Sequence, residues 1–158
     1  MIRTLTLLLL SALVTLAPAQ TPAEHVAIGD SLLRTGKAAK ALAHYEKAVA
    51  ADPSPKHLTA RAGALLELLK LDRFLVDSDA ALLADSCVPG GNHLRAGYSY
   101  RMQDRHGALR LAERGLSCTP DSLDRGRLLL IRGMALADLR REAEAAVDLA
   151  AGMAILDK

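Results

Sequence analysis

The side chains that could carry covalent or metal chemistry are two cysteines and five histidines. No two histidines have the i, i+4 or His-Glu-x-x-His spacing that brings two imidazoles to one metal ion. The sequence also lacks a Cys-x-x-Cys pair, a phosphate-binding glycine loop and a Gly-x-Ser-x-Gly turn. We therefore predict no metal site, no cofactor and no enzymatic activity. We interpret the histidines as surface or hairpin residues: His25, His44, His57, His93 and His106.

The two cysteines lie in matching Ser-Cys-x-Pro contexts, at the predicted ends of two successive helices. An exported protein could join Cys87 and Cys118 in a disulfide. If the helices stack, equivalent positions are about 8 to 10 Å apart, whereas a disulfide needs Cα atoms within about 7 Å. The spacing of the two cysteines is short of a full repeat, which could bring them closer. A bridge and a pair of buried apolar thiols both remain open.

The first 19 residues have the layout of a cleavable secretory signal. Arg3 gives a basic start, Leu5 to Ala17 form an apolar run, and Ala17-Pro18-Ala19 supplies a small-x-small end. The alternative is a retained membrane anchor, but the run has about 13 residues and a span needs about 20. We predict removal of residues 1–19, no stable membrane insertion afterwards, and a periplasmic or secreted bacterial protein.

The composition favours helices. The chain is 51% hydrophobic, yet it has no Trp, one Phe and three Tyr. Its apolar content comes from alanine and leucine, whereas strands favour β-branched and aromatic residues. We therefore predict an all-α protein.

The clearest pattern begins at Thr21. A small residue is followed three positions later by a bulky one, and then by a second set of small and aromatic residues before a proline: Gly29, Leu32, Ala41, Tyr45, Ala48 and Pro53. The second set is echoed at Ala108/Ala112/Gly115 and Ala145/Leu149/Gly152. In the second unit Asp77 stands at the first of these positions, which requires a longer hairpin around residues 70–73.

Glycines recur in step with this pattern. Gly29, Gly63 and Gly97 are evenly spaced and Gly133 follows at nearly the same interval, each of them three positions before a bulky side chain. Glycine inside a helix costs about 1 kcal/mol relative to alanine. Four glycines in register therefore indicate contacts between paired helices. The alternative is an alanine- and leucine-rich bundle in which the glycines are accidental.

These residues resemble the tetratricopeptide repeat, a helix-turn-helix unit of about 34 residues. The resemblance implies a right-handed α-solenoid of about four hairpins within residues 20–158, divided near 22–55, 56–89, 90–125 and 126–158. It also implies a protein-interaction scaffold in which the first helix of each unit lines a concave groove. The groove candidates are Asp30, Arg34, His57, Glu67, Tyr98, Arg101, Arg127 and Asp138.

Two details refine this expectation. One subfamily clamps a peptide's terminal carboxylate with Lys, Asn and Arg, but Asp30 stands where that clamp would need Asn, so the clamp is not supported. Tyr98 with Arg101 and Arg127 forms the best candidate anchor, because aromatic and arginine side chains are enriched in binding hot spots. The alternative is that these are ordinary groove side chains without a ligand.

Charge suggests the kind of partner. Residues 90–141 carry ten arginines and five acidic residues. This block could meet an acidic protein or peptide segment, or it could be a solvated face. Nucleic acid is disfavoured, because aromatic residues that would stack on bases are nearly absent.

The last predicted helix, 142–156, has only a thin polar stripe, formed by Glu144 and Asp148. Solenoids normally end in a helix with a polar outer face. Either the many alanines merely make this helix look apolar, or its face is covered. The second interpretation gives an alternative function, a homo-oligomeric structural component assembled through terminal helices.

Overall fold

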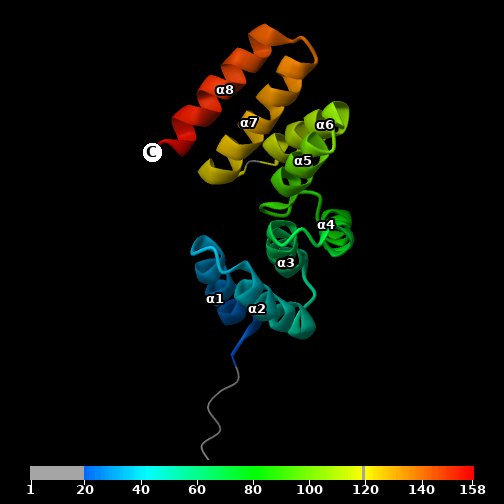
Figure 1. Ribbon diagram of the computed structural model, residues 1–158, viewed down its shortest axis with the longest axis vertical. Coiled ribbons are helices and arrows are strands. Elements are labelled where there is room, and N and C mark those ends of the chain that lie inside the picture. The colour runs from blue at the N-terminus through cyan, green and yellow to red at the C-terminus, as the bar shows by residue number, and fades with distance from the viewer. Residues whose placement is uncertain (1–19, 119) are drawn as a thin grey trace, which may run out of the picture.

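The computed structural model describes residues 20–118 and 120–158, so the predicted signal segment lies outside the described residues. All regular structure in these ranges is helical, which confirms the all-α prediction. The helices pair into four antiparallel hairpins that follow one another as a solenoid from the N-terminal to the C-terminal end (Figure 1). Their bounds are α1 Pro22–Arg34, α2 Ala38–Ala51, α3 Pro55–Glu67, α4 Leu71–Ala84, α5 Gly91–Arg101, α6 Arg105–Ser117, α7 Ser122–Asp138 and α8 Glu142–Leu156.

Side chains fix several helix starts. The hydroxyl of Thr21 accepts the N–H of Glu24, and the Glu24 carboxylate accepts the N–H of Thr21 in return, which closes a capping box on α1. Asp104 caps α6, and Asp121 caps α7. Helix α7 begins at Ser122, four residues before the predicted unit boundary at 126. In the described part of the chain, no helix is both long and apolar enough to cross a membrane.

All four hairpins turn in the same way. Three residues separate the paired helices, and the middle one has a left-handed backbone, with φ of 72°, 56°, 66° and 64° at Gly36, Leu69, Gln103 and Arg140. The N–H of the next residue donates to a carbonyl five positions earlier, as Lys37 does to Leu32 and Lys70 to Leu65. The prediction of a longer hairpin in the second unit was therefore wrong.

The shared turn also fixes which residues are equivalent. Gly29 and Gly133 each lie seven positions before the left-handed turn residue, and a Cβ added at either would meet Tyr45 at 2.5 Å or Leu149 at 2.8 Å on the paired helix. At the same position the second and third units have Ala62 and Ala96, both fully buried. The expectation that Gly63 and Gly97 lie at this contact was therefore wrong by one residue.

The size of the facing residue explains the difference. Sixteen positions after the small residue, the first and fourth units carry Tyr45 and Leu149, whereas the second and third carry Ser78 and Ala112. A large side chain requires glycine on the other helix, while a small one leaves room for alanine. Counting from the left-handed turn residue also corrects the second helix of the second unit. The residue equivalent to Ala41 there is the fully buried Phe74, not Asp77.

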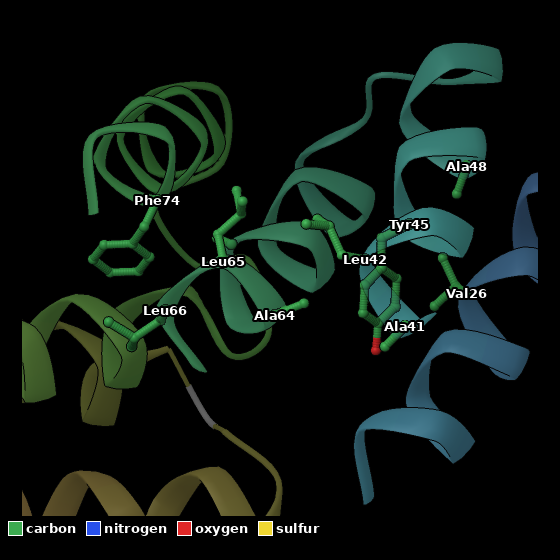
Figure 2. Close-up of a cluster of buried hydrophobic side chains, with 10 residues drawn as sticks. Val26, Ala41, Leu42, Tyr45, Ala48, Ala64, Leu65, Leu66 and Phe74 are labelled. Atoms are coloured by element: carbon green, nitrogen blue, oxygen red, sulfur yellow. The ribbon is translucent and has the colours of Figure 1, made fainter. Parts of the chain in front are cut away.

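The core runs continuously from the first hairpin to the second (Figure 2). Tyr45 fills the space between α1 and α2, and its hydroxyl donates to Asp30 Oδ1 at 2.7 Å. Burial, and then this hydrogen bond, raise the pKa of Tyr45 far above its usual value. Phe74 packs against Tyr98 of the third hairpin, with ring centroids 5.2 Å apart.

Two hairpins are also held by a bidentate ion pair. Arg61 on α3 donates to both oxygens of Asp77 on α4, at 2.7 Å each. Arg132 on α7 bonds Asp148 on α8 in the same way, at 2.5 and 2.7 Å. The two aspartates are buried. The sequence analysis had placed Asp77 at the position of Ala41 and Asp148 in a polar stripe, and it predicted neither ion pair.

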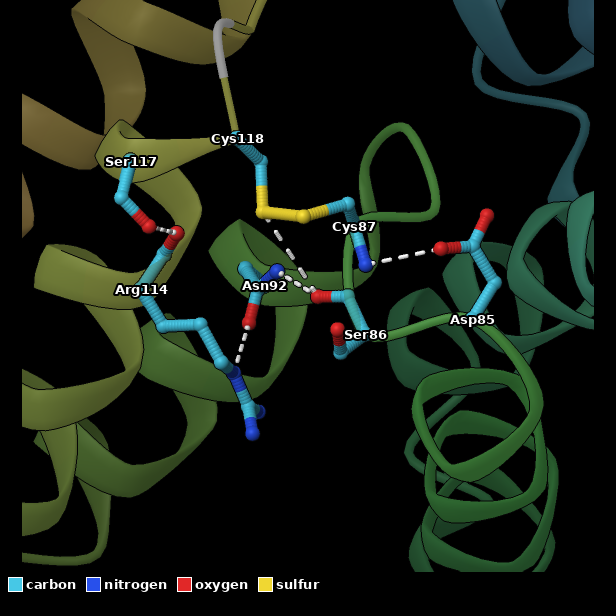
Figure 3. The surroundings of a disulfide bond; sticks show 7 residues. All are labelled: Asp85, Ser86, Cys87, Asn92, Arg114, Ser117 and Cys118. Carbon is cyan, nitrogen blue, oxygen red and sulfur yellow. Dashed lines mark hydrogen bonds between the residues drawn. A yellow bond between two sulfur atoms is a disulfide. The ribbon is translucent and has the colours of Figure 1, made fainter.

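A disulfide closes the third hairpin. Cys87 follows α4 and Cys118 follows α6, and their sulfur atoms are bonded, with Cα atoms 5.4 Å apart (Figure 3). The wider separation expected for stacked helices does not apply, because both residues lie in connecting segments beyond the helix ends. Beside the bridge, the amide of Asn92 donates to the carbonyl of Ser86 at 2.8 Å and accepts from Arg114 at 2.9 Å.

The buried ion pairs predict a contrast between neighbouring aspartates. Asp77→Ala should lower the free energy of unfolding by about 3 kcal/mol, because it breaks a two-bond ion pair whose arginine and aspartate side chains are only 20% and 6% exposed. Asp79→Ala removes a more exposed partner of Arg95 and should cost less than about 1 kcal/mol. Urea unfolding followed by circular dichroism compares the two. Equal losses of stability in the two variants would contradict the role assigned to the Arg61–Asp77 pair.

The glycines predict opposite responses to one added methyl group. Gly29→Ala should destabilise the protein by about 1 to 3 kcal/mol, because its Cβ overlaps the Tyr45 ring. Gly63→Ala should stabilise it by up to about 1 kcal/mol, because the nearest atom is 3.9 Å away and alanine favours the helix. Thermal and urea unfolding measure both. A destabilised Gly63→Ala variant would show that this glycine has a packing role.

Removing the disulfide should lower stability mainly by freeing the unfolded chain. A closed loop of this length is worth about 3 to 4 kcal/mol. We expect Cys87→Ala/Cys118→Ala to lose that amount relative to the oxidised protein, and a reducing agent to destabilise the wild type but not the double variant. Unfolding midpoints with and without reductant test this. An unchanged wild-type midpoint would contradict it.

Candidate functional site

The first helices of the four units line one concave groove with a cavity of about 450 Å³. Aliphatic side chains from successive units form most of its wall, namely Leu33, Leu66, Leu94, Leu130, Ile131 and Met134. Gly63 and Gly97 also line it. A Cβ on either glycine would meet only a leucine or isoleucine methyl, at 3.9 or 3.6 Å. Internal packing therefore does not require these glycines. Without side chains they leave space in the groove that a larger residue would fill.

Three charged side chains add polar chemistry to this groove. Glu67 ends α3, Arg101 ends α5, and Arg127 lies in the first turns of α7. All three are exposed to solvent. Within residues 20–118 and 120–158, neither arginine takes part in an ion pair. Other arginines of the basic block are already paired, such as Arg105 with Asp138 and Arg132 with Asp148.

Of the residues predicted to line the groove, the structure brings together Glu67, Arg101 and Arg127. His57 is buried instead at the start of α3, where its Nδ1 donates to the Asp52 carbonyl at 2.8 Å. Asp30 accepts the Tyr45 hydroxyl, and Asp138 pairs with Arg105. Arg34 is exposed at the end of α1, outside the cavity lining.

The proposed anchor is therefore only partly assembled. Arg101 and Arg127 share the groove, but Tyr98 is not among the residues that line it. Its ring packs on Phe74, and Arg95 lies over the ring with its guanidinium carbon 5.8 Å from the centroid. Tyr98 contributes to the joint between the second and third units instead.

Sequence reasoning missed most of the aliphatic lining. The signal was present in the repeat itself: in three of the four units the residue after the small contact residue lines the groove, namely Gly63, Gly97 and Met134. Recognising this signal requires the register set by the hairpin turns. The glycine spacing had placed the contact residue one position too late in the second and third units. With that register corrected, Leu94 and Ile131 also occupy equivalent positions, each nine residues before the left-handed turn residue of its hairpin.

A largely buried carboxylate fixes the start of α5 against α7. Asp124 accepts the N–H of Gly90 at 2.6 Å and lies 2.6 Å from Nδ1 of His93, a groove residue. Burial alone would raise the pKa of Asp124. The hydrogen bond and charge of His93, together with the Gly90 N–H and the charge of Arg127, outweigh burial and lower the pKa below its usual value. Asp124 thus fixes the start of α7, which carries Arg127, against the start of α5, which carries Arg101.

The described residues contain no cluster of three or more His, Cys, Asp or Glu side chains placed to hold a metal ion. Within the same part of the chain, the groove combines an apolar wall with two guanidinium groups and one carboxylate that form no ion pair. Such a surface can bind a segment with apolar and charged side chains.

Comparison with known proteins identifies the fold. No protein-family model matches the chain, and no curated protein matches it. Among solved structures, the crystal structure of a thermophilic TPR (tetratricopeptide repeat) protein from Thermus thermophilus is similar over 87% of this chain and 76% of its own, with a TM-score of 0.73 and 21% sequence identity. The chain therefore has the fold of a TPR solenoid.

Proposed function

We propose that this chain is a protein-interaction scaffold of the bacterial cell envelope that binds an extended or helical segment of a partner protein in its concave groove. The observation that carries the proposal is the groove itself, a cavity of about 450 Å³ that successive first helices line with aliphatic side chains. The TPR-like fold supports a scaffold role in general.

The two arginines indicate an acidic partner. A free guanidinium at the edge of an apolar surface binds carboxylates with paired hydrogen bonds. Arg101 and Arg127 come from neighbouring first helices and both line the cavity. A ligand with apolar side chains on the groove wall could therefore place an acidic side chain between them. Glu67 lies in the same groove and would favour a basic or amide group further along that ligand.

The proposed compartment is supported by two independent features. The N-terminal segment has the layout of an export signal. The Cys87–Cys118 disulfide suits an oxidising compartment such as the periplasm or the cell exterior. Both features fit a scaffold that acts after export.

A defined peptide probe tests the groove. We would select ligands from a phage-displayed library of random 12-residue peptides on the immobilised protein, synthesise the most enriched sequence, and measure its binding by fluorescence anisotropy. We expect enriched peptides to combine aliphatic and acidic residues. Arg101→Glu/Arg127→Glu should weaken binding at least about tenfold, because each loses an attractive charge and gains a repulsive one.

The matched control is Arg110→Glu, which changes an exposed arginine on the second helix α6, outside the groove lining. It should leave the affinity within about twofold and keep the same helical circular dichroism spectrum. An equal loss of peptide affinity in the double variant and in Arg110→Glu would indicate general attraction between charges, and not recognition by the groove. Unchanged binding by the double variant would place the peptide elsewhere and contradict the proposal.

A further inference from the structure

A second kind of cavity recurs in the second, third and fourth units, between the two helices of each hairpin. Each such cavity is lined by the residue eight positions before the left-handed turn residue and by the residue eight positions after it. The cavity of the third unit shares no lining residue with the concave groove. The residues at the two positions are Arg61 and Asp77, Arg95 and Leu111, and Arg132 and Asp148.

The third unit therefore keeps the arginine but has leucine in place of its carboxylate partner. The Arg95 side chain is 19% exposed, as little as that of Arg61, which is 20% exposed. Arg95 instead lies 2.8 Å from a carboxylate oxygen of Asp79 on α4, a side chain that is 61% exposed, whereas Asp77 is 6% exposed. A half-buried guanidinium that lacks a bidentate partner favours an added carboxylate.

Two further arginines line the same cavity. Arg110 stands where the second and fourth units have Val76 and Val147. Arg114 donates from Nε to Asn92 at 2.9 Å, and its Nη atoms extend past this contact, away from the disulfide (Figure 3). Both arginines are exposed, and neither forms an ion pair within the described ranges. Their guanidinium groups can therefore accept an anionic ligand.

The three cavities differ in the acidic residues that line them. In the third unit this lining contains one acidic residue, Asp104, and its carboxylate already accepts the N–H of Gly107 at 2.8 Å as the cap of α6. The cavities of the second and fourth units hold more carboxylates, namely Asp72 and Asp77, and Glu113, Glu144 and Asp148. Positive charge thus dominates only in the third.

The third cavity is also the roomiest of the three. Its volume is about 480 Å³, compared with about 270 Å³ in each of the other two. Smaller residues explain the difference. Ser99 and Gly107 line it where the second and fourth units have Leu65 and Leu136, and Arg73 and Glu144. A space of this size suits a small organic molecule.

We infer that the cavity of the third unit binds a small organic anion that carries two or more carboxylate groups. One carboxylate of the ligand takes the place relative to Arg95 that Asp77 takes relative to Arg61. A second carboxylate meets Arg110 and Arg114, and Leu111 contacts the carbon skeleton between them. The inference does not depend on what the concave groove binds.

Isothermal titration calorimetry with citrate tests this inference. We would use an ionic strength of about 0.1 M, which limits non-specific attraction between charges, and expect saturable binding at one site. Leu111→Asp supplies the carboxylate found in the second and fourth units and so competes with the ligand for Arg95. Leu111→Asn makes a side chain of the same size without the charge. The aspartate variant should bind citrate at least about tenfold more weakly than the asparagine variant.

Two further measurements keep the test specific. Leu111→Asp should unfold at a higher urea concentration than Leu111→Asn, because the new carboxylate pairs with Arg95. Arg125→Gln changes an exposed arginine of α7 outside the cavity and should bind citrate as the wild type does.

Three outcomes would overturn the inference. The first is a wild-type protein that does not bind citrate. The second is equal citrate affinity in the aspartate and asparagine variants. The third is binding of hexaglutamate without binding of citrate, which would make the cavity a docking site for an acidic protein segment. Peptide binding in the groove is tested separately by Arg101→Glu/Arg127→Glu, so the two proposals can fail independently.

Discussion

The structure depends on how closely two helices can approach at one crossing within each hairpin. Where the second helix carries Tyr45 or Leu149, the first must offer glycine, and where the second carries a small residue, alanine suffices. The two residues at the crossing change together so that the hairpin keeps one shape. Because all four hairpins also share one turn, they stack as repeats of one module although their side chains differ.

This arrangement separates packing from recognition along each first helix. One residue faces the paired helix and is buried, and the next faces the groove, as Ala62 and Gly63 or Ala96 and Gly97 illustrate. A Cβ at Gly63 or Gly97 would meet only one methyl group within 4 Å, so the residue at these positions can follow the ligand rather than the fold. The basic block divides in the same way. Arg132 holds α8 through Asp148, whereas Arg101 and Arg127 have no ion pair among the described residues and face the groove.

Much of the fold could be predicted from the sequence, because helix caps, turns and small residues act locally. The capping box at Thr21 and the pairing of α1 with α2 followed from residue types alone. The second unit was harder, since Ala62 and Gly63 are both small and only the left-handed turn at Leu69 shows which one meets the paired helix. That one-residue shift also hid the aliphatic groove residues and the Arg61–Asp77 pair. Tyr98 could not be placed because its contact with Phe74 joins different units, and such contacts depend on how hairpins stack.

The central claim is that the first helices form the surface that binds a partner. Hydrogen–deuterium exchange of the protein, free and saturated with a library-selected peptide, tests it most directly. The account predicts slower exchange in α3, α5 and α7, around residues 63–67, 94–101 and 127–134, with little change on the outer sides of α2, α4 and α6. Protection confined to the second helices would contradict the account.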